Sequence, residues 1–493
     1  MSEQNDSSAG RPPHSYEDVR VERIETMRAE GFDPYESGFK RTHTSEDIHQ
    51  KYAHLELDVE TTDVVNVGGR VLSIRNKGLF MTLVDGAGSI QVSFHPTWTP
   101  EQVIALRAHV RRGDYIGVQG IVRRTKRGEI TVNGTSIHML CSAMTALPET
   151  YSGFEDPDVR YRARHLDWIV NDDSVARMRL RSKIIAETRS FMWDNAFMEV
   201  ETPILQPIYG GAAADPFTTH HNALHADMFL RIAPELYLKR MLVGGVSERL
   251  FEIGRVFRNE GLSTRHNPEF TMMEAYAAYW DLQDVMAMVE DLFQTLAKNL
   301  HGSMEFDYEG RELDFSTFTT MTMPEAVKKY TGVDFLPMDE TEARAAAKKL
   351  NLPETEKASW GGCLQAAFEE LVEKELFQPT FITHFPIEIS PFARSMPEDA
   401  RLVDRFELFV NGWELANAYN ELNEPIEQRS RMMDQLRLGE TREIDEAFLS
   451  AMDIGMPPAG GLGIGMDRLI MVLTGATTIR DVLAFPALRH SNK

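Results

Sequence analysis

The spacing of apolar residues divides the chain into segments of different secondary structure. From Tyr16 to His54 apolar residues recur at helical intervals, and Gly31 stands where a helix would end. From Val64 to His138 the pattern changes to short runs rich in β-branched and aromatic residues, separated by turn dipeptides and by one helical piece near Glu101–Val110. We therefore predict a helical N-terminal arm followed by a small domain of five strands.

A second, larger domain is expected after a polar segment. Residues 148–171 contain Pro148 and Pro157 and are predicted to be a linker. A long helix is predicted from about Asp172 to Asn195, and strands then alternate with helices to the end of the chain. Residues 305–375 are interpreted as an acidic helical insertion. The predicted organisation is a disordered start and helical arm over 1–63, a β domain over 64–147, the linker, and a large domain over 172–493.

Charge is unevenly distributed along the chain. The 493 residues carry a net charge of −23, but residues 66–145 contain ten Lys and Arg against four Asp and Glu. Five strands with one intervening helix are typical of an OB-fold barrel, which binds single-stranded nucleic acid through a basic groove and aromatic platforms. Phe80 and Phe94, with Arg70 and Arg75 nearby, are candidates for such a surface. The alternatives of a solvated basic face and of phenylalanines in the core stay open.

Composition argues against several classes of protein. No apolar run reaches the roughly 18 residues of a membrane helix, and the polar start lacks a secretory signal, so a soluble cytoplasmic protein is expected. Cys141 and Cys363 are far apart and have no Cys or His near them at metal-ligand spacing. We therefore expect buried thiols, with neither a disulfide nor a zinc site.

Candidate chemistry begins near residue 250, where two β-runs are joined by a polar loop. Period-two alternation places Phe270, Met272, Glu274 and Tyr276 on one strand face, which offers a stacking surface, a carboxylate and a phenol. Each residue alone has an ordinary explanation as core or surface ion pair, so only the combination indicates a site. The loop adds cations suited to phosphates and contains Arg258, Glu260, Arg265 and His266.

A hairpin is predicted at Asn411-Gly412, which lies between two alternating runs. In that register Phe409 pairs with Glu414, and Glu407 lies on the same face two residues away. Like charges so placed repel unless a cation intervenes, which suits Mg²⁺ bound with a substrate phosphate. Solvated edge charges are the alternative interpretation of the two glutamates.

Three polar residues of the second strand, Asn417, Tyr419 and Glu421, alternate and share a face. A regular strand would put them on the face away from Glu414. Either a bulge near Leu415 reorients the strand, or the two sets of residues serve different sites.

Four glycines, at positions 460, 461, 463 and 465, are predicted to form a turn before an apolar helix that begins near Met466. Glycine permits close backbone approach to a ligand, and a helix start favours negative charge. The spacing is not that of a dinucleotide-binding fingerprint. Arg468, at the helix start, is suited to clamp a nucleotide.

Together and in this order, the three segments resemble the signature motifs of class II aminoacyl-tRNA synthetases. The run FMEVETPIL, with Pro203, resembles the first motif, FRNEG with RHNPEFTMMEAY the second, and GLGIGMDR the third. The resemblance extends from about Ser15 to Arg489. It implies an anticodon-binding OB-fold barrel and a catalytic domain built on an antiparallel sheet flanked by helices, with the first motif at the interface of a homodimer. The strings RIAPELYLKR and GWELANAYNEL are most similar to the lysyl-tRNA synthetases.

This resemblance implies an ATP- and Mg²⁺-dependent lysine–tRNA ligase that acts on L-lysine and tRNA(Lys). Arg258 and Arg468 would be catalytic. The lysine site would comprise Gly211, Glu235 and Glu274 at the α-amino group, Arg258 and Asn417 at the carboxylate, and Tyr276 and Glu421 at the ε-ammonium, with Tyr419 in the same site. ATP would contact Arg258, Glu260, His266, Phe270, Glu407 and Arg468, and Glu407 and Glu414 would hold two or three Mg²⁺ ions per subunit. The anticodon would meet Arg70, Arg75, Phe80, Gln91 and Glu129.

Two positions depart from the family pattern. Asp215 stands where an Arg is expected, close to Gly211, and Ala459 stands where a Thr is expected. Two other functions remain as alternatives: a protein-lysylating paralogue, which would resemble the catalytic domain alone, and an inactive homologue that binds RNA.

Overall fold

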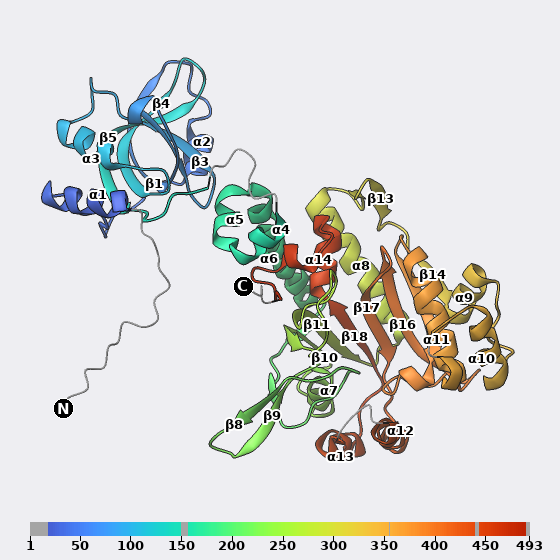
Figure 1. The fold of residues 1–493 in the computed structure, drawn as a ribbon. Helices are drawn as coiled ribbons and strands as arrows, with labels where there is room; N and C mark the ends of the chain where they lie inside the picture. Colours follow the sequence, from blue (N-terminus) through green and yellow to red (C-terminus); the bar gives the residue numbers. More distant parts are fainter. Residues whose placement is uncertain (1–17, 149–155, 354, 439–442, 490–493) are drawn as a thin grey trace, which may run out of the picture. The chain divides into compact units, whose positions relative to one another are not determined.

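The computed structural model describes residues 18–148, 156–353, 355–438 and 443–489, and the chain forms two compact units divided between Gly153 and Phe154 (Figure 1). The disorder expected for the first 15 residues therefore lies outside the described residues. No helix among the described residues is long and apolar enough to cross a membrane.

The first unit is the predicted five-stranded barrel. Its strands close in the order β1-β2-β3-β5-β4, and the predicted helix lies between β3 and β4. Val67, Met81, Val92 and Phe94 point into a fully buried core, which makes Phe94 a core residue and not a platform for bases. The elements are β1 (Glu60–Arg75), β2 (Phe80–Val84), β3 (Ser89–Ser93), α3 (Glu101–His109), β4 (Tyr115–Arg124) and β5 (Ile130–Cys141).

Two helices precede the barrel, α1 (Asp18–Ala29) and α2 (Ser45–Tyr52). Gly31, with φ +85°, follows the end of α1 as predicted. Met27 of α1 and Ile48 of α2 are completely buried in the barrel core. The expected arm is therefore packed against the barrel as part of the same unit.

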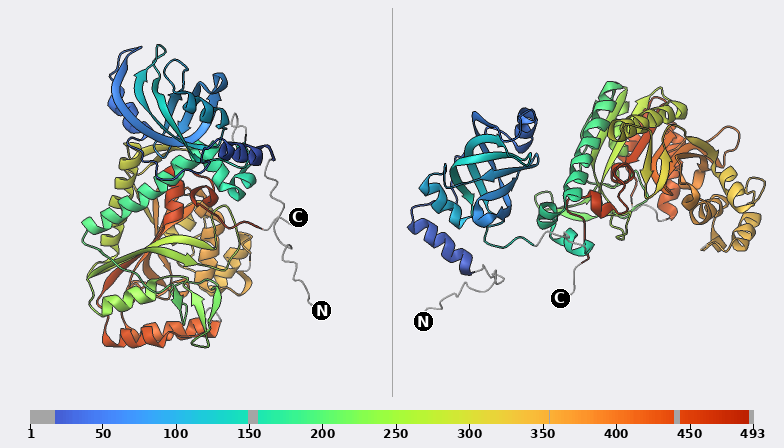
Figure 2. Two further views of the ribbon diagram at one scale, coloured as in Figure 1. Left: turned by 90° about the vertical axis from the view of Figure 1, so that its left-hand side faces the viewer. Right: turned by 90° about the horizontal axis from the view of Figure 1, so that it is seen from above.

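The second unit is built on an eight-stranded sheet in the order β14-β15-β16-β17-β18-β11-β10-β6 (Figures 1 and 2). The pairs β14·β15 and β6·β10 are parallel, and the other five are antiparallel. The strands are β6 (Met198–Glu199), β10 (Arg249–Phe257), β11 (Glu269–Ala278), β14 (Thr319–Thr322), β15 (Thr380–Pro386), β16 (Leu402–Val410), β17 (Trp413–Asn420) and β18 (Ala459–Gly465).

One face of this sheet carries the main hydrophobic core. Alternate residues such as Met273, Ala416 and Ile464 pack there against three helices. The predicted long helix is confirmed as α6 (Asp172–Asp194), and it is joined by α8 (Leu282–His301) and α14 (Met466–Thr474). Period-two alternation then leaves the opposite face of β11, β17 and β18 free for polar residues. That face is partly covered by α7 (Glu235–Val243), α12 (Pro425–Leu438) and α13 (Glu446–Ile454).

The interpretation of residues 305–375 as helical is wrong for their first part. Residues 305–322 form a hairpin, β12 (Glu305–Tyr308) and β13 (Arg311–Asp314), and then the edge strand β14. The physical reason is visible in the pattern, because Phe306 and Tyr308 are buried at period two and the buried Leu313 pairs with Phe306 across the hairpin. Only the second part is helical, with α9 (Met323–Thr331), α10 (Glu340–Lys349) and α11 (Trp360–Leu371).

Smaller elements complete the second unit. The short strands β7 (Leu205–Gln206), β8 (Thr218–His221) and β9 (Ala226–Leu230) form a separate three-stranded sheet. Single 3₁₀ turns lie at Asn76–Gly78 in the barrel and at Thr355–Lys357, Glu373–Glu375 and Ile387–Ile389.

The segment expected as a linker contains two short helices, α4 (Pro157–Arg162) and α5 (Arg164–Val170). The buried Arg164 connects them to the C-terminal α15 (Ile479–Val482) and the residues after it. Its guanidinium lies 2.8 Å from the buried Asp167 Oδ2 and donates to the carbonyls of Leu483 and Ala484 at 3.0 and 3.1 Å.

We predict that Arg164→Ala lowers the free energy of unfolding of the second unit by about 2–4 kcal/mol, because two carbonyls would lose their buried donor and Asp167 would keep only Arg160 as a cationic partner. Urea denaturation followed by circular dichroism measures the change. Arg162→Ala, which removes an exposed pair with Asp158, is the control and should cost less than about 1 kcal/mol. Equal losses for the two variants would contradict the role given to Arg164.

Candidate active site

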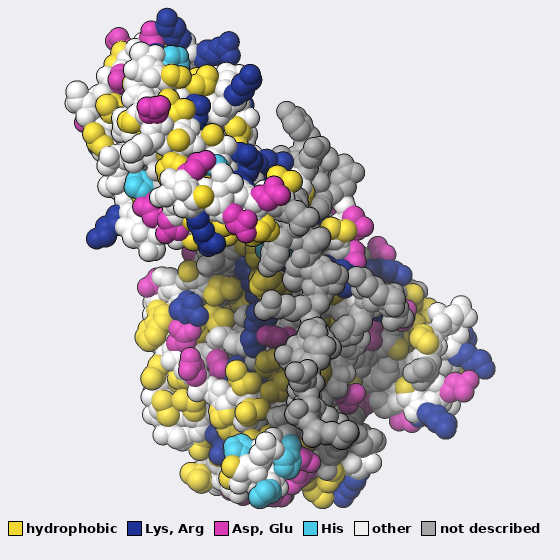
Figure 3. Space-filling view, turned by 60° about the vertical axis from the view of Figure 1, so that its left-hand side comes forward, with side chains coloured by type: hydrophobic (Ala, Val, Ile, Leu, Met, Phe, Trp, Pro, Cys, Tyr) yellow, Lys and Arg dark blue, Asp and Glu magenta, His cyan; other side chains and the backbone are white. Residues whose placement is uncertain are grey.

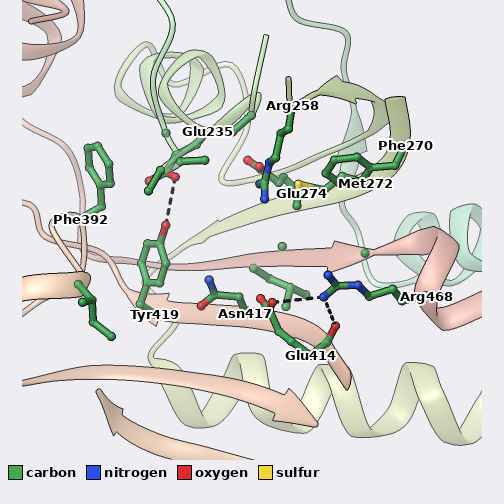
Figure 4. Close-up of a pocket in the computed structure, with 18 of the residues that line it drawn as sticks. Glu235, Arg258, Phe270, Met272, Glu274, Phe392, Glu414, Asn417, Tyr419 and Arg468 are labelled. Atoms are coloured by element: carbon green, nitrogen blue, oxygen red, sulfur yellow. Dashed lines mark hydrogen bonds and ion pairs between the residues drawn. The ribbon is translucent and has the colours of Figure 1, made fainter. Parts of the chain in front are cut away.

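A cavity of about 600 Å³ opens on the polar face of the large sheet (Figure 4). Its walls come from β11, β17, β18, α7 and the loop after β10. Most residues singled out in the sequence of this unit line it: Gly211, Glu235, Arg258, Glu260, His266, Phe270, Glu274, Tyr276, Glu414, Asn417, Tyr419 and Arg468.

Strand β11 contributes one whole face to the cavity. Phe270, Met272, Glu274 and Tyr276 line it, as their alternation predicts. The intervening Met273, Ala275 and Ala277 are buried in the main core on the other side. Because β11 is paired on both edges, with β10 and β18, its side chains are held at fixed spacing.

The predicted hairpin and the bulge are both present. Asn411 and Gly412 have φ of +56° and +64°, as a tight two-residue turn requires. Phe409 pairs with Glu414, but the preceding Leu408 pairs with Ala416, so Leu415 is the extra residue. Leu415 and Ala416 are both buried, and the bulge brings Glu414 to the same face as Asn417 and Tyr419. The structure thus has the bulge and brings Glu414, Asn417 and Tyr419 to one cavity, whereas Glu407 lines the adjoining cavity and Glu421 is buried behind the wall.

The glycines 460–465 form strand β18 in the middle of the sheet, so their assignment to a turn is corrected. A Cβ at Gly461 would overlap with Glu421 Oε1 and lie 2.8 Å from Tyr276 Cε1. The absence of a side chain therefore makes room for Glu421 beneath the strand. At Gly463 an added Cβ would meet no atom closer than 3.8 Å.

One end of the pocket is acidic. Glu235, Glu274 and Glu421 are buried there. Tyr419 Oη donates to Glu235 Oε2 at 3.1 Å, and Tyr276 Oη donates to Glu274 Oε2 at 3.2 Å. Burial raises the pKa of Glu274 well above its ordinary value, and raises that of Glu421 to about 8 against the opposing effect of Lys239. Such a group of buried acids favours a positively charged ligand.

Sequence reasoning missed Lys239, whose ammonium is buried among these acids. Its Nζ lies 2.6 Å from Glu235 Oε1 and 2.5 Å from Glu421 Oε2. Burial alone would lower the pKa of Lys239, but the two carboxylates raise it. Glu421 nevertheless receives no well-directed hydrogen bond from the residues that the structure describes. The four-residue spacing of Glu235 and Lys239 in PELYLK was the available signal.

The other end of the pocket is basic and aromatic. Arg258 points into the cavity from the end of β10, with its guanidinium carbon 5.3 Å from the centre of the Phe270 ring (Figure 4). Arg468 Nη1 donates to the Glu414 carbonyl at 2.9 Å, and Nη2 lies 3.0 Å from His266 Nε2. Two guanidinium groups beside an aromatic ring are suited to phosphates and a planar base.

Glu407 lines an adjoining cavity that also contains Glu414. Burial raises the pKa of Glu407 to about 8, the charge of Glu414 adds to the rise, and Arg405 opposes it from 2.5 Å. Within the described part of the chain no three acidic, His or Cys side chains gather as a metal site. Proteins nevertheless often bind Mg²⁺ through only one or two carboxylates, while substrate phosphates and water supply the other ligands.

The barrel brings together three of the five candidate anticodon residues. Phe80 pairs with Arg75, whose Nη2 donates to Gln91 Oε1 at 2.6 Å. Arg70 instead donates to Tyr115 Oη at 2.9 Å, and Glu129 is exposed just before β5. Lys and Arg side chains are visible at several places on the surface of this unit in Figure 3.

Comparisons with known proteins match both units. A family model of class II tRNA synthetases (D, K and N) matches residues 156–489, and a model of the OB-fold nucleic acid binding domain matches residues 65–140. A lysine–tRNA ligase of Rhizobium leguminosarum bv. trifolii is 52% identical over 493 residues, 99% of each chain. Lysine–tRNA ligases of Rhizobium etli and Enterococcus faecalis are 53% and 46% identical, over 96% of this chain and 96% and 97% of their own lengths.

We predict that Gly461→Ala lowers the free energy of unfolding by about 1–3 kcal/mol, because the new methyl group would displace Glu421 or Tyr276. Gly463→Ala, where the space is open, should leave stability unchanged or raise it by up to about 1 kcal/mol. Thermal unfolding of both variants measures the difference. Destabilisation of the two variants by the same amount would refute the steric argument.

Proposed function

The chain belongs to the class II tRNA synthetases, in the family of lysine–tRNA ligases, and from this premise we propose how its pocket acts on lysine, ATP and tRNA. The reaction has two steps. A carboxylate oxygen of L-lysine attacks the α-phosphorus of ATP and pyrophosphate leaves. A 3′-terminal ribose hydroxyl of tRNA(Lys) then attacks the carbonyl carbon of the lysyl-adenylate, and AMP leaves.

The observation that carries the choice of lysine is the buried carboxylate of Glu421. It is buried directly behind the cavity wall at Gly461 and contacts Lys239, a cation that it shares with Glu235, so part of its charge is left for an ammonium of the ligand. An aspartate site would need a cation free to meet a carboxylate. The cation at the acidic end, Lys239, is already engaged by two acids.

The remaining lysine contacts follow from the positions of the lining residues. Glu235, Glu274 and Gly211 would hold the α-amino group, and Arg258 and Asn417 the carboxylate. Glu421 and Tyr276 would meet the ε-ammonium, with Tyr419 along the side chain. A carboxylate held by Arg258 would be fixed next to the basic end, where the α-phosphate must lie for in-line attack.

The basic end is suited to ATP. Phe270 and Arg468 would enclose the adenine, while Glu260 and His266 would lie on the phosphate side. Glu407 and Glu414 would hold Mg²⁺, which when bound neutralises phosphate charge. Arg258 and Arg468 would stabilise the negative charge that develops during both steps, because fixed cations in a partly buried site need no reorganisation.

The barrel supports a role for the chain with tRNA. Phe80 and Gln91, with Arg75 beside them, would stack on and hydrogen-bond to anticodon bases, and Arg70 and Glu129 would contact them from further along the surface. The relatives match over nearly the whole chain, barrel included, which disfavours the protein-lysylating alternative. The competent residues in the pocket disfavour an inactive homologue.

A homodimer is the proposed assembly, and the cytoplasm the proposed location. The dimer is supported by exposed apolar side chains in and beside the first motif, where Trp193, Met198, Ile204 and Leu205 are each at least 39% exposed. Apolar patches of this kind mark interaction surfaces.

We predict lysine-dependent ATP–pyrophosphate exchange in the presence of Mg²⁺, with no exchange on aspartate or asparagine. Glu421→Gln should raise the KM for lysine about 100-fold, because the substrate ammonium would be left without its charged partner. Glu446→Gln, an exposed acid paired with Arg429, is the matched control and should behave as the unchanged protein. Exchange with another amino acid would overturn the choice of lysine.

We further predict that lysine binding releases a proton near pH 7. Glu421 faces Lys239, Glu235, Tyr276 and Tyr419, and its raised pKa of about 8 leaves the free carboxyl largely protonated at that pH. Binding of an ammonium requires the carboxylate, so affinity should weaken as pH falls from about 8 to about 6, by at most about tenfold per unit. Calorimetry in buffers of different ionisation enthalpy, without ATP, measures the release. Glu421→Gln should lower the number of protons released, and Glu274, whose pKa burial also raises, would account for the remainder. Release that is unchanged in this variant would assign the proton to another group.

A further inference from the structure

Lys239 is a buried ammonium to which the function proposed above gives no task. Its side chain is 1% exposed and lies behind the residues that line the cavity. Besides Glu235 and Glu421, it faces three aromatic rings, with Nζ at 4.9 Å from the centre of Phe392, 5.5 Å from that of Tyr419 and 5.8 Å from that of Tyr276. Two carboxylates and an aromatic cage form an ammonium-binding site that the chain fills itself.

The charges at this end of the pocket give Lys239 a defined effect. Glu235, Glu274 and Glu421 are opposed by Lys239 beside them and by Arg258 at the basic end of the same pocket, so these five groups together carry one negative charge when all the acids are ionised. The neighbouring pairs Arg231–Glu252 and Arg405–Glu407 are each neutral. Free lysine has two ammonium groups and one carboxylate, so its single positive charge matches the pocket. Without Lys239 the pocket would carry two uncompensated charges, and adjacent buried acids would share a proton instead.

Lys239 also fixes where Glu421 points. Glu421 Oε2 lies against the ammonium, while Oε1 lies beneath Gly461 and close to Tyr276. Glu235, on the preceding turn of α7, is held by the same ammonium and by Tyr419. Lys239 therefore contacts both Glu235, the proposed partner of the substrate's α-amino group, and Glu421, the proposed partner of its ε-ammonium.

We propose that Lys239 is a specificity-determining positioning residue, which orients Glu421, lowers the cost of ionising it when the substrate binds, and sets the charge of the ionised pocket to match one lysine. This inference rests on the proposed function. It implies that the loss of Lys239 acts on lysine binding through Glu235 and Glu421, and leaves the ATP end of the pocket unchanged.

The first test is Lys239→Met, which keeps the length of the side chain and removes its charge. In ATP–pyrophosphate exchange the KM for lysine should rise about tenfold or more, with kcat within about threefold and the KM for ATP unchanged. Lys328→Met, which removes a 60% exposed lysine on α9, is the control and should match the unchanged protein. A lysine KM near that of the unchanged protein would overturn the proposal, and so would equal losses in both KM values.

The second test separates charge from volume and serves also if Lys239→Met does not fold. Lys239→Ala, purified with n-propylammonium, should regain a low KM for lysine, whereas the isosteric propan-1-ol should have no effect. Rescue by both compounds would overturn the proposal by showing that only packing matters. Rescue by neither compound would also overturn it, because the charge would then not be used. The unchanged protein, assayed with the same additives, tests the proposed function separately, because absence of its lysine-dependent exchange would refute that function whatever the variants do.

Discussion

Buried carboxylates are the constraint around which the second unit is arranged. Glu235, Glu274 and Glu421 come from a helix, a strand and the end of another strand, and they converge at one end of the pocket, where each is at most 5% exposed. Ionised acids in such a space are unfavourable unless cations or hydrogen-bond donors accompany them. Lys239, Tyr276 and Tyr419 supply part of that compensation, and the remainder is left for a ligand. The acidic pocket is therefore selective because it is incompletely neutralised.

The sheet provides the rigidity that this arrangement requires. Strand β18 lies between β11 and β17, and its glycines have no side chains to occupy the space above the acids. The bulge at Leu415 turns Glu414 toward the same cavity without disturbing the buried Ala416 and Ala418. The acidic end and the basic end thus line one cavity, where the proposed substrates would be held at fixed distances.

A chain with a net charge of −23 can still have a surface suited to RNA, because its positive charge is concentrated in one unit. The barrel contains the basic stretch, while the second unit is acidic overall and places Arg258 and Arg468 at the basic end of its pocket. Each sign of charge is thus concentrated opposite the proposed ligand group of the other sign: cations at the proposed phosphate contacts, and acids at the proposed amine contacts.

The sequence by itself determined the barrel, the long helix α6, the hairpin at Asn411-Gly412 and the pocket face of β11, because these depend on local periodicity and turn chemistry. It did not determine that residues 305–322 are strands, that Phe94 is core, or that the glycines form a central strand, since those outcomes depend on which partner each segment meets. The sequence left open whether a bulge occurs at Leu415, and only pairing with β16 decided it. Lys239 was missed because its importance comes from Glu421, 182 positions away along the chain, and only the tertiary fold brings their charges within contact distance.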